Sequence, residues 1–111
     1  MADLGSVTFE GQSGNQYAFR AYTFDHPLRR VGAVYTVLHS VPKPGGGYVM
    51  NPLYFGQTGD ITERFEGHHR QQCFQRNASN SVAFHVDEDE VSRRAKETDL
   101  IRRWNPQCNR T

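Results

Sequence analysis

The stretch LYFGQTGDITERFEGHH, residues 53–69, changes its periodicity within a few positions. It begins with apolar and aromatic residues that favour a β-strand, and the Gly-Gln-Thr-Gly segment at 56–59 then predicts a turn. Asp60, with Glu63 three residues later, is typical of the first turn of a helix. The stretch therefore predicts a strand, a turn and a helix in immediate succession.

The helix predicted after Asp60 would bury one face and carry polar groups beside it. At about 100° per residue, Ile61, Phe65 and Gln72 fall on one side, with Arg64 and His68 next to them. The arginine and the histidine are four positions apart and project together. The residues alone leave a satisfied structural pair and a catalytic pair both open.

The rest of the chain alternates between strand and helix patterns. Pro52 predicts an irregular start to one strand, and Asn105-Pro106 predicts the end of the last helix. The predicted elements are a hairpin within residues 5–24, strands at 31–38, 48–55 and 81–86, a loop at 75–79, and a helix from about 87 to 104 with Asp87 as its candidate cap. This order predicts an α+β fold with a small, mainly antiparallel three-stranded sheet flanked by helices, plus an extra N-terminal β-hairpin.

We expect a single domain over residues 1–111, in which residues 1–30 form the hairpin extension and residues 31–111 form the core. No apolar run approaches the roughly 18 to 20 residues of a membrane helix, and the start of the chain lacks a signal-peptide pattern. We therefore expect a cytoplasmic protein with no membrane partner. Cys73 and Cys108 stand far apart, so reduced thiols are expected, with a disulfide as the less favoured alternative.

The basic residues are distributed unevenly, although the net charge is only +1. Of 13 basic residues 11 are arginine, and 9 of the 13 lie from Arg64 onward. The small net charge argues against a strongly basic nucleic-acid-binding surface. Arginine's planar fork nevertheless suits phosphate oxygens, while arginine-rich helices also form ordinary solvated salt-bridged faces.

Glu97 falls in the apolar arc of the last predicted helix. A carboxylate in such a place needs an arginine, hydrogen bonds or a cation, because burying it alone is costly. Arg64, Arg93 and Arg94 are the candidate ion-pair partners, and a metal ion is the alternative. A zinc site is weakly supported, since the available side chains lack paired ligand spacing: His68, His69, Cys73, His85 and Cys108.

Tyr35 and Tyr54 occupy matching places on two apolar strands, where core aromatics are common. The segments around them and the polar residues that follow resemble the GIY-YIG nuclease family. Ala33-Val34-Tyr35 is similar to the first family tripeptide and Tyr54-Phe55-Gly56 to the second. Arg64, His68, Glu97 and Asn109 then follow in family order. The departures are Ala33 for glycine, Val34 and Phe55 for isoleucine, and a longer connection at 42–47.

This resemblance implies a metal-dependent endonuclease, a hydrolase that cuts DNA phosphodiester bonds with one Mg²⁺ or Mn²⁺ per site. Glu97 would hold the metal, and Arg64 would stabilise charge on the phosphate. Tyr35 would orient or deprotonate the attacking water with help from His68, for which His69 is a rival. Tyr54 would position the water or a phosphate oxygen, and Asn109 would fix the geometry of the site.

Binding of DNA, including branched or single-stranded DNA, would use backbone contacts that carry no sequence information. The candidate phosphate contacts are Lys43, Arg70, Arg76, Arg93, Arg94, Arg102 and Arg103. We expect no separate recognition domain, so a partner protein, a homodimer or the N-terminal hairpin would supply affinity. The alternative function is a nucleic-acid- or partner-binding module of the same fold that does not cut.

Overall fold

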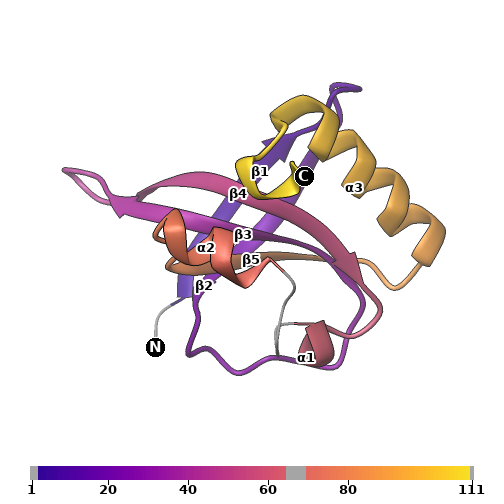
Figure 1. Ribbon diagram of the computed structural model, residues 1–111, viewed down its shortest axis with the longest axis horizontal. Coiled ribbons are helices and arrows are strands. Elements are labelled where there is room, and N and C mark those ends of the chain that lie inside the picture. Colours follow the sequence, from indigo (N-terminus) through magenta and orange to yellow (C-terminus); the bar gives the residue numbers. More distant parts are fainter. Residues whose placement is uncertain (1–2, 65–69, 111) are drawn as a thin grey trace.

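The computed structural model describes residues 3–64 and 70–110, apart from the side chains of Glu63 and Arg64. In this part of the chain a single five-stranded sheet has the strand order β1-β2-β5-β3-β4 (Figure 1). The strands are β1 (Asp3–Glu10), β2 (Gln16–Thr23), β3 (Ala33–Pro42), β4 (Tyr48–Thr58) and β5 (Ser81–Val86). The helical elements are α1 (Ile61–Arg64), α2 (Gln71–Arg76), α3 (Glu90–Trp104) and the 3₁₀ turn η1 (Gln107–Asn109). Among these helices, none has both the length and the apolar character needed to cross a bilayer.

The predicted α+β class is confirmed, but the prediction of a three-stranded sheet is wrong. The N-terminal hairpin of β1 and β2 joins the sheet, because β2 pairs antiparallel with β5 from Arg20 opposite Phe84 to Thr23 opposite Ser81. Most of β5 is apolar on both faces. Pairing with β2 covers the edge of β5, whose backbone N–H and C=O groups would otherwise be unpaired. The hairpin is therefore part of the central sheet.

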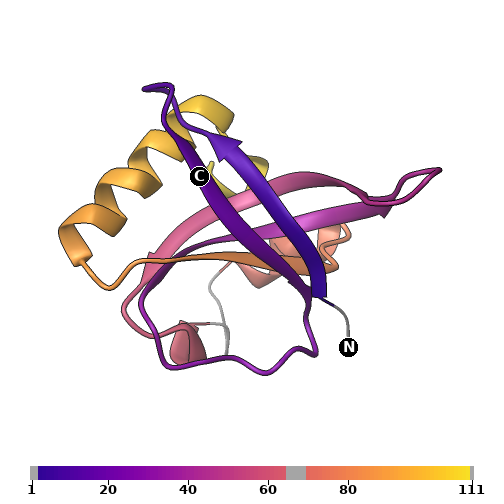
Figure 2. The same cartoon turned by 180° about the vertical axis from the view of Figure 1, so that it is seen from behind.

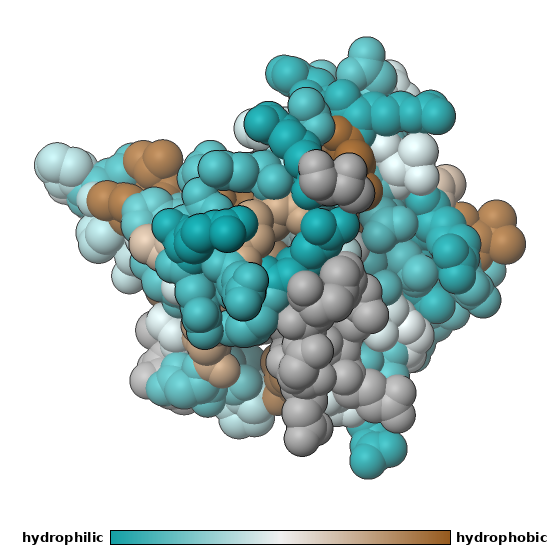
Figure 3. Space-filling view, viewed as in Figure 1, coloured by the Kyte–Doolittle hydropathy of each residue, from teal (hydrophilic) through white to brown (hydrophobic). Residues whose placement is uncertain are grey.

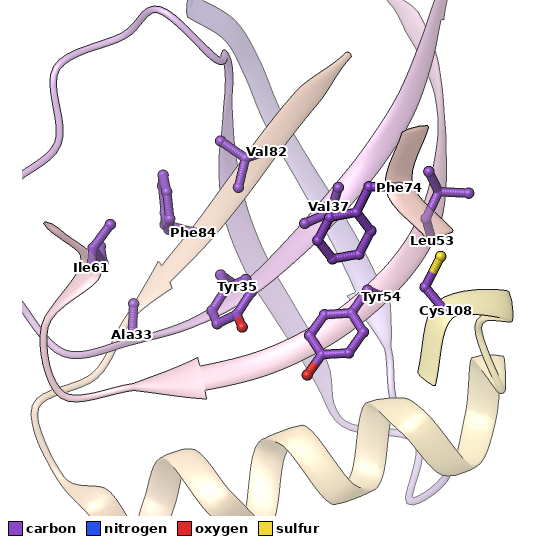
Figure 4. Packing of buried hydrophobic residues seen from close by; sticks show 10 residues of the cluster. All are labelled: Ala33, Tyr35, Val37, Leu53, Tyr54, Ile61, Phe74, Val82, Phe84 and Cys108. Carbon is purple, nitrogen blue, oxygen red and sulfur yellow. The ribbon is translucent and has the colours of Figure 1, made fainter. Parts of the chain in front are cut away.

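Strand β3 lies between β5 and β4 and is buried on both faces, as its continuous apolar run predicts. Its side chains alternate between two clusters. Tyr35 and Val37 belong to a cluster with Phe74 of α2 (Figure 4), while Val34 belongs to a second cluster with Leu100 of α3. The sheet thus separates two small cores, one near α2 and the other near α3.

Strand β4 is an edge strand with an irregular register, as Pro52 predicts. Val37 of β3 pairs with Tyr54, but the next residue, Leu38, pairs with Pro52. Leu53 is therefore the extra residue on β4. An edge strand tolerates proline because no neighbouring strand needs a hydrogen bond from the N–H that proline lacks.

The helices begin and end near the predicted places, with two corrections. Asp60 accepts a hydrogen bond from the N–H of Thr62 at 2.9 Å, which fits the predicted helix start. Helix α2 continues to Arg76, so the predicted loop at 75–79 begins later than expected. The cap of α3 is Asp89, which accepts from the Ser92 N–H at 2.9 Å, rather than Asp87.

Asp87 instead forms an ion pair, in which Lys96 Nζ lies 2.8 Å from its Oδ2. Bonds from Lys96 and from the Ser92 hydroxyl hold the pKa of this carboxyl well below its usual 3.8. Lys96 is on the second turn of α3, and Asp87 follows β5 directly. The pair therefore fixes the start of α3 against the end of the sheet.

Asp99 of α3 attaches the N-terminal hairpin to the rest of the fold. Its carboxylate accepts from the Tyr17 hydroxyl at 2.6 Å, from the Ser13 hydroxyl at 2.7 Å and from the Ser13 N–H at 2.8 Å. These bonds lower the pKa of Asp99 below its usual value, with the Tyr17 bond the largest cause. Figure 2 shows the hairpin turn beside α3. The hairpin is therefore held at both ends, by β5 and by α3.

Candidate functional site

The two tyrosines of the predicted site lie on neighbouring strands and face the same core. The ring centroids of Tyr35 and Tyr54 are 6.0 Å apart, and Phe74 packs edge-on against Tyr54. Tyr35 is 0% exposed and Tyr54 is 7% exposed. In Figure 4 both hydroxyl groups point in the direction of α3. The rings are therefore packed as core aromatics, with their polar ends directed toward the helix that carries Glu97.

Gly56 is the position on β4 that lets the Tyr35 ring reach this edge of the sheet. Tyr35 and Gly56 are opposite each other in the β3–β4 register. A Cβ atom at Gly56 would lie 2.5 Å from both Cζ and the hydroxyl oxygen of Tyr35, a separation that real Cβ atoms do not adopt. The ring thus lies directly across the glycine. This close approach explains the glycine at position 56.

We expect Gly56→Ala to destabilise the protein by about 2 kcal/mol, because the added methyl group must displace the Tyr35 ring from a packed core. Gly59→Ala is the matched control: a Cβ there would lie 3.6 Å from Arg93 Nη2, an ordinary contact. Its expected effect is within about 0.5 kcal/mol. Urea unfolding of both variants measures the difference.

A double-mutant cycle assigns this cost to the tyrosine. Replacing Tyr35 by leucine in the Gly56→Ala background removes the clashing atoms, so the two changes together should cost less than their sum by at least about 1 kcal/mol. Equal destabilisation by Gly56→Ala and Gly59→Ala would contradict the packing described for Tyr35.

Asn109 binds the edge of β4 between Tyr54 and Gly56. Its Oδ1 accepts from the Phe55 N–H at 2.8 Å, and its Nδ2 donates to the Phe55 carbonyl at 2.9 Å. The amide thereby satisfies both backbone groups of an edge residue, as a further strand would. Asn109 thereby holds the segment of β4 that carries Tyr54 and Gly56, while its role in fixing the geometry of a catalytic site stays a prediction.

Arg93 anchors α3 to the other end of the same segment. Its side chain is only 6% exposed; Nε donates to Gln57 Oε1 at 3.0 Å, and Nη1 donates to the Asp87 carbonyl at 3.1 Å. Its Nη1 is also so close to Gly32 that a Cβ there would lie 2.5 Å away. A phosphate contact needs an accessible guanidinium, so the structure corrects the prediction for Arg93 and assigns it to packing.

Glu97 is half-buried on α3, one helical turn after Arg93. Arg93 bonds to Gln57 of β4, and Leu100, three residues beyond Glu97, packs in one cluster with Phe55. Residues three and four apart on a helix share a face. We infer that Glu97 faces residues 55–57 of β4, between these two contacts. Tyr54 directly precedes this segment of the edge strand, Tyr35 and Asn109 contact it, and the role predicted for Glu97 beside them stays a prediction.

Three predicted site residues lie outside the described part of the chain, wholly or in their side chains. Arg64 is the last residue of α1, and its side chain lies outside the described part of the chain. His68 and its rival His69 also lie outside the described residues. Their predicted roles stay predictions.

The predicted phosphate contacts are spread over several surfaces. Lys43 is exposed on the β3–β4 turn, which projects away from α3 (Figure 1). Arg94, Arg102 and Arg103 are exposed on α3, where Arg94 pairs with Glu90 at 2.9 Å. The structure therefore does not bring Lys43 together with the arginines of α3.

The cysteines form a disulfide, so the prediction of two reduced thiols is wrong. Cys73 of α2 and Cys108 of η1 are bonded with their Cα atoms 5.7 Å apart. They are separated by 35 positions in the sequence, which hides their closeness in the fold. Disulfides are typical of oxidising compartments, so the two cysteines give no support to a cytoplasmic location. That location stays a prediction.

The described residues do not provide the group of ligands that a zinc site needs. No group of three or more His, Cys, Asp or Glu side chains converges among them. The disulfide also removes both thiols from the zinc alternative. Glu97 is a single half-buried carboxylate, and its role as a ligand of Mg²⁺ or Mn²⁺ stays a prediction.

No family model matches the sequence, and no curated protein and no solved structure is significantly similar to it.

Proposed function

We propose that this protein is a metal-dependent endonuclease of the GIY-YIG type that hydrolyses DNA phosphodiester bonds. The observation that supports the proposal is the shared position of Tyr35, Tyr54 and Asn109 around residues 54–56 of β4. Arg93, one turn before Glu97, bonds to the adjacent Gln57. Residues that are up to 74 positions apart in the sequence thus approach one edge of the sheet.

Each side chain of the group has a chemical role in this proposal. Tyr35 orients the attacking water through its hydroxyl, and Tyr54 holds the water or a phosphate oxygen beside it. Asn109 keeps the β4 backbone fixed, so that the two phenols keep their separation. His68 would assist Tyr35 in activating the water, and Arg64 would supply positive charge to the phosphate as negative charge develops.

Glu97 would hold one Mg²⁺ or Mn²⁺ ion. Mg²⁺ is commonly bound through one or two carboxylates while it keeps several waters, so a single glutamate fits this ion. When bound, the ion would neutralise charge on the phosphate group. The half-buried place of Glu97 suits the role, because attraction between charges is stronger away from bulk water.

The Tyr35→Phe substitution is the sharpest test of the role that we propose for Tyr35 in orienting water. We expect Tyr35→Phe to lower cleavage of plasmid DNA by about 10² to 10³-fold, because it removes the hydroxyl but keeps the packed ring. The assay follows supercoiled plasmid, single-stranded and branched DNA with Mg²⁺, with Mn²⁺ and with EDTA. EDTA should stop cutting by the unmodified protein.

The outcomes separate the two candidate functions. Metal-dependent cutting that Tyr35→Phe loses supports the nuclease. Metal-dependent cutting that Tyr35→Phe retains shows that Tyr35 only packs and removes it from the mechanism. DNA binding without cutting under any metal condition would contradict the nuclease and favour the non-catalytic binding module.

A further inference from the structure

An arginine-lined pocket lies beside the disulfide on the face shown in Figure 3, where hydrophilic side chains gather over α2 and the C-terminal segment. It is an open pocket of about 570 Å³. The described residues that line it are Arg70, Cys73, Arg76, Asn77, Gln107 and Arg110. Three of these six residues are arginines and none is acidic. The pocket therefore concentrates positive charge in a chain whose net charge is only +1.

We propose that this arginine pocket binds a phosphate of the DNA backbone next to the bond that is cut. The proposal rests on the proposed nuclease function and extends it to a second phosphate-binding position. Arg110 directly follows Asn109, whose amide is bonded to Phe55 of β4. Neighbouring Cα atoms are about 3.8 Å apart, so the pocket adjoins the candidate catalytic group. A bound strand can reach both places.

Two of the arginines are held in place before any ligand arrives. Arg70 Nη1 donates to the Arg110 carbonyl at 3.3 Å, which joins the start of α2 to the C-terminal segment. Arg110 donates through Nε and Nη2 to the Asn105 carbonyl at 3.3 Å and 2.9 Å. A guanidinium has five N–H donors, so these bonds leave Arg110 with donors for phosphate oxygens.

The disulfide and Asn77 hold the two walls of the arginine pocket together. Cys73 belongs to the α2 wall and Cys108 to the η1 wall. Asn77 Nδ2 donates to the Cys73 carbonyl at 2.8 Å and lies 3.8 Å from Cys108 Sγ. The exposed Arg76 completes the pocket at the end of α2. Because the walls are already held in place, the pocket loses less conformational entropy when DNA binds.

The test measures binding of fluorescein-labelled single-stranded and duplex 20-mers by fluorescence anisotropy in EDTA, where no cutting occurs. Arg76→Gln and Arg110→Gln should each raise Kd by about tenfold, the loss expected for a charge-assisted hydrogen bond. On duplex DNA, each should reduce the slope of log Kd against log salt by about 0.9. Lysine at either position should keep the slope but recover only part of the affinity.

Arg20→Gln is the matched control, since it removes the same charge from an exposed arginine paired with Asp3. Arg20 is on β2, which β5 and β3 separate from β4 in the strand order. An equal loss of affinity in Arg20→Gln, or no loss in the Arg76 and Arg110 variants, overturns the arginine pocket. If the plasmid assay still shows cutting, the nuclease function stands. If the unmodified protein neither binds nor cuts DNA, both proposals fall.

Calorimetry with inorganic phosphate separates a backbone contact from a site for the free ion. The backbone proposal expects phosphate to bind at least about 10³-fold more weakly than the 20-mer, because one ion offers no additional contacts. Phosphate binding as tight as oligonucleotide binding would overturn it.

Discussion

Replacement of Glu97 by glutamine is expected to lower DNA cleavage by about 10³-fold, equivalent to about 4 kcal/mol of transition-state stabilisation. Glutamine has the same shape but lacks the charge that would hold a divalent cation. Binding of DNA in EDTA should be unchanged or tighter, because the variant has one negative charge fewer near the phosphate. This combination separates a lost metal ligand from a lost fold.

Glu90→Gln is the control for this experiment. Glu90 is on the same helix, and its side chain is 61% exposed in an ion pair with Arg94. Surface pairs of this kind contribute little, so its cleavage rate should stay within about twofold of the unmodified protein. Measurement of cleavage rates over a range of Mn²⁺ concentrations compares the variants. A folded Glu97→Gln protein with more than about a tenth of the normal rate would remove Glu97 from the mechanism.

The local elements of the fold could be predicted from the sequence because their signals are short-range. Strand β5 matches its predicted range, residues 81–86, since an apolar run is bounded by polar residues on both sides. Helix α3 ends at Trp104 as predicted, because proline at 106 disfavours helical geometry at residue 105. The pairing of β2 with β5 joins residues that are far apart in the sequence, from Arg20 with Phe84 to Thr23 with Ser81, and no local pattern encodes it.

The candidate site was predictable by residue type and order but not by contact. The sequence places Tyr35, Tyr54 and Asn109 in a recognisable series. It does not show that the Tyr35 ring lies over Gly56, or that Asn109 bonds to both backbone groups of Phe55. Both contacts arise from the β3–β4 register and from the path of the chain after α3, which local periodicity does not determine.

Arg93 shows how a charged residue on a helix can mislead a sequence analysis. Most arginines of such helices are exposed, so its position predicts a surface charge. Its burial depends on two acceptors from other elements, Gln57 Oε1 and the Asp87 carbonyl. Gly32 leaves room for the guanidinium. The local sequence gives one signal for this burial, the glycine before β3. The packing of α3 against that glycine explains it.

Removal of the Cys73–Cys108 disulfide is expected to lower the free energy of unfolding by about 4 kcal/mol. The bond closes a loop with a sequence separation of 35, and chain-entropy arguments give about this value for a loop of that length. For a domain of this size, the same change lowers Tm by about 15 °C. Urea and thermal unfolding of the oxidised protein and of Cys73→Ala/Cys108→Ala measure the effect.

Reduction provides an independent check on this prediction. Dithiothreitol should lower the Tm of the unmodified protein toward that of the double-alanine variant, and it should leave the variant unchanged. The loss should also reach the candidate site, because Asn109 directly follows Cys108 and bonds to Phe55 of β4. Amide hydrogen exchange should therefore increase at Phe55 before it increases in β3, which is buried between two strands. Equal stability of the oxidised and reduced proteins would show that the sheet and α3 hold η1 in place without the covalent bond.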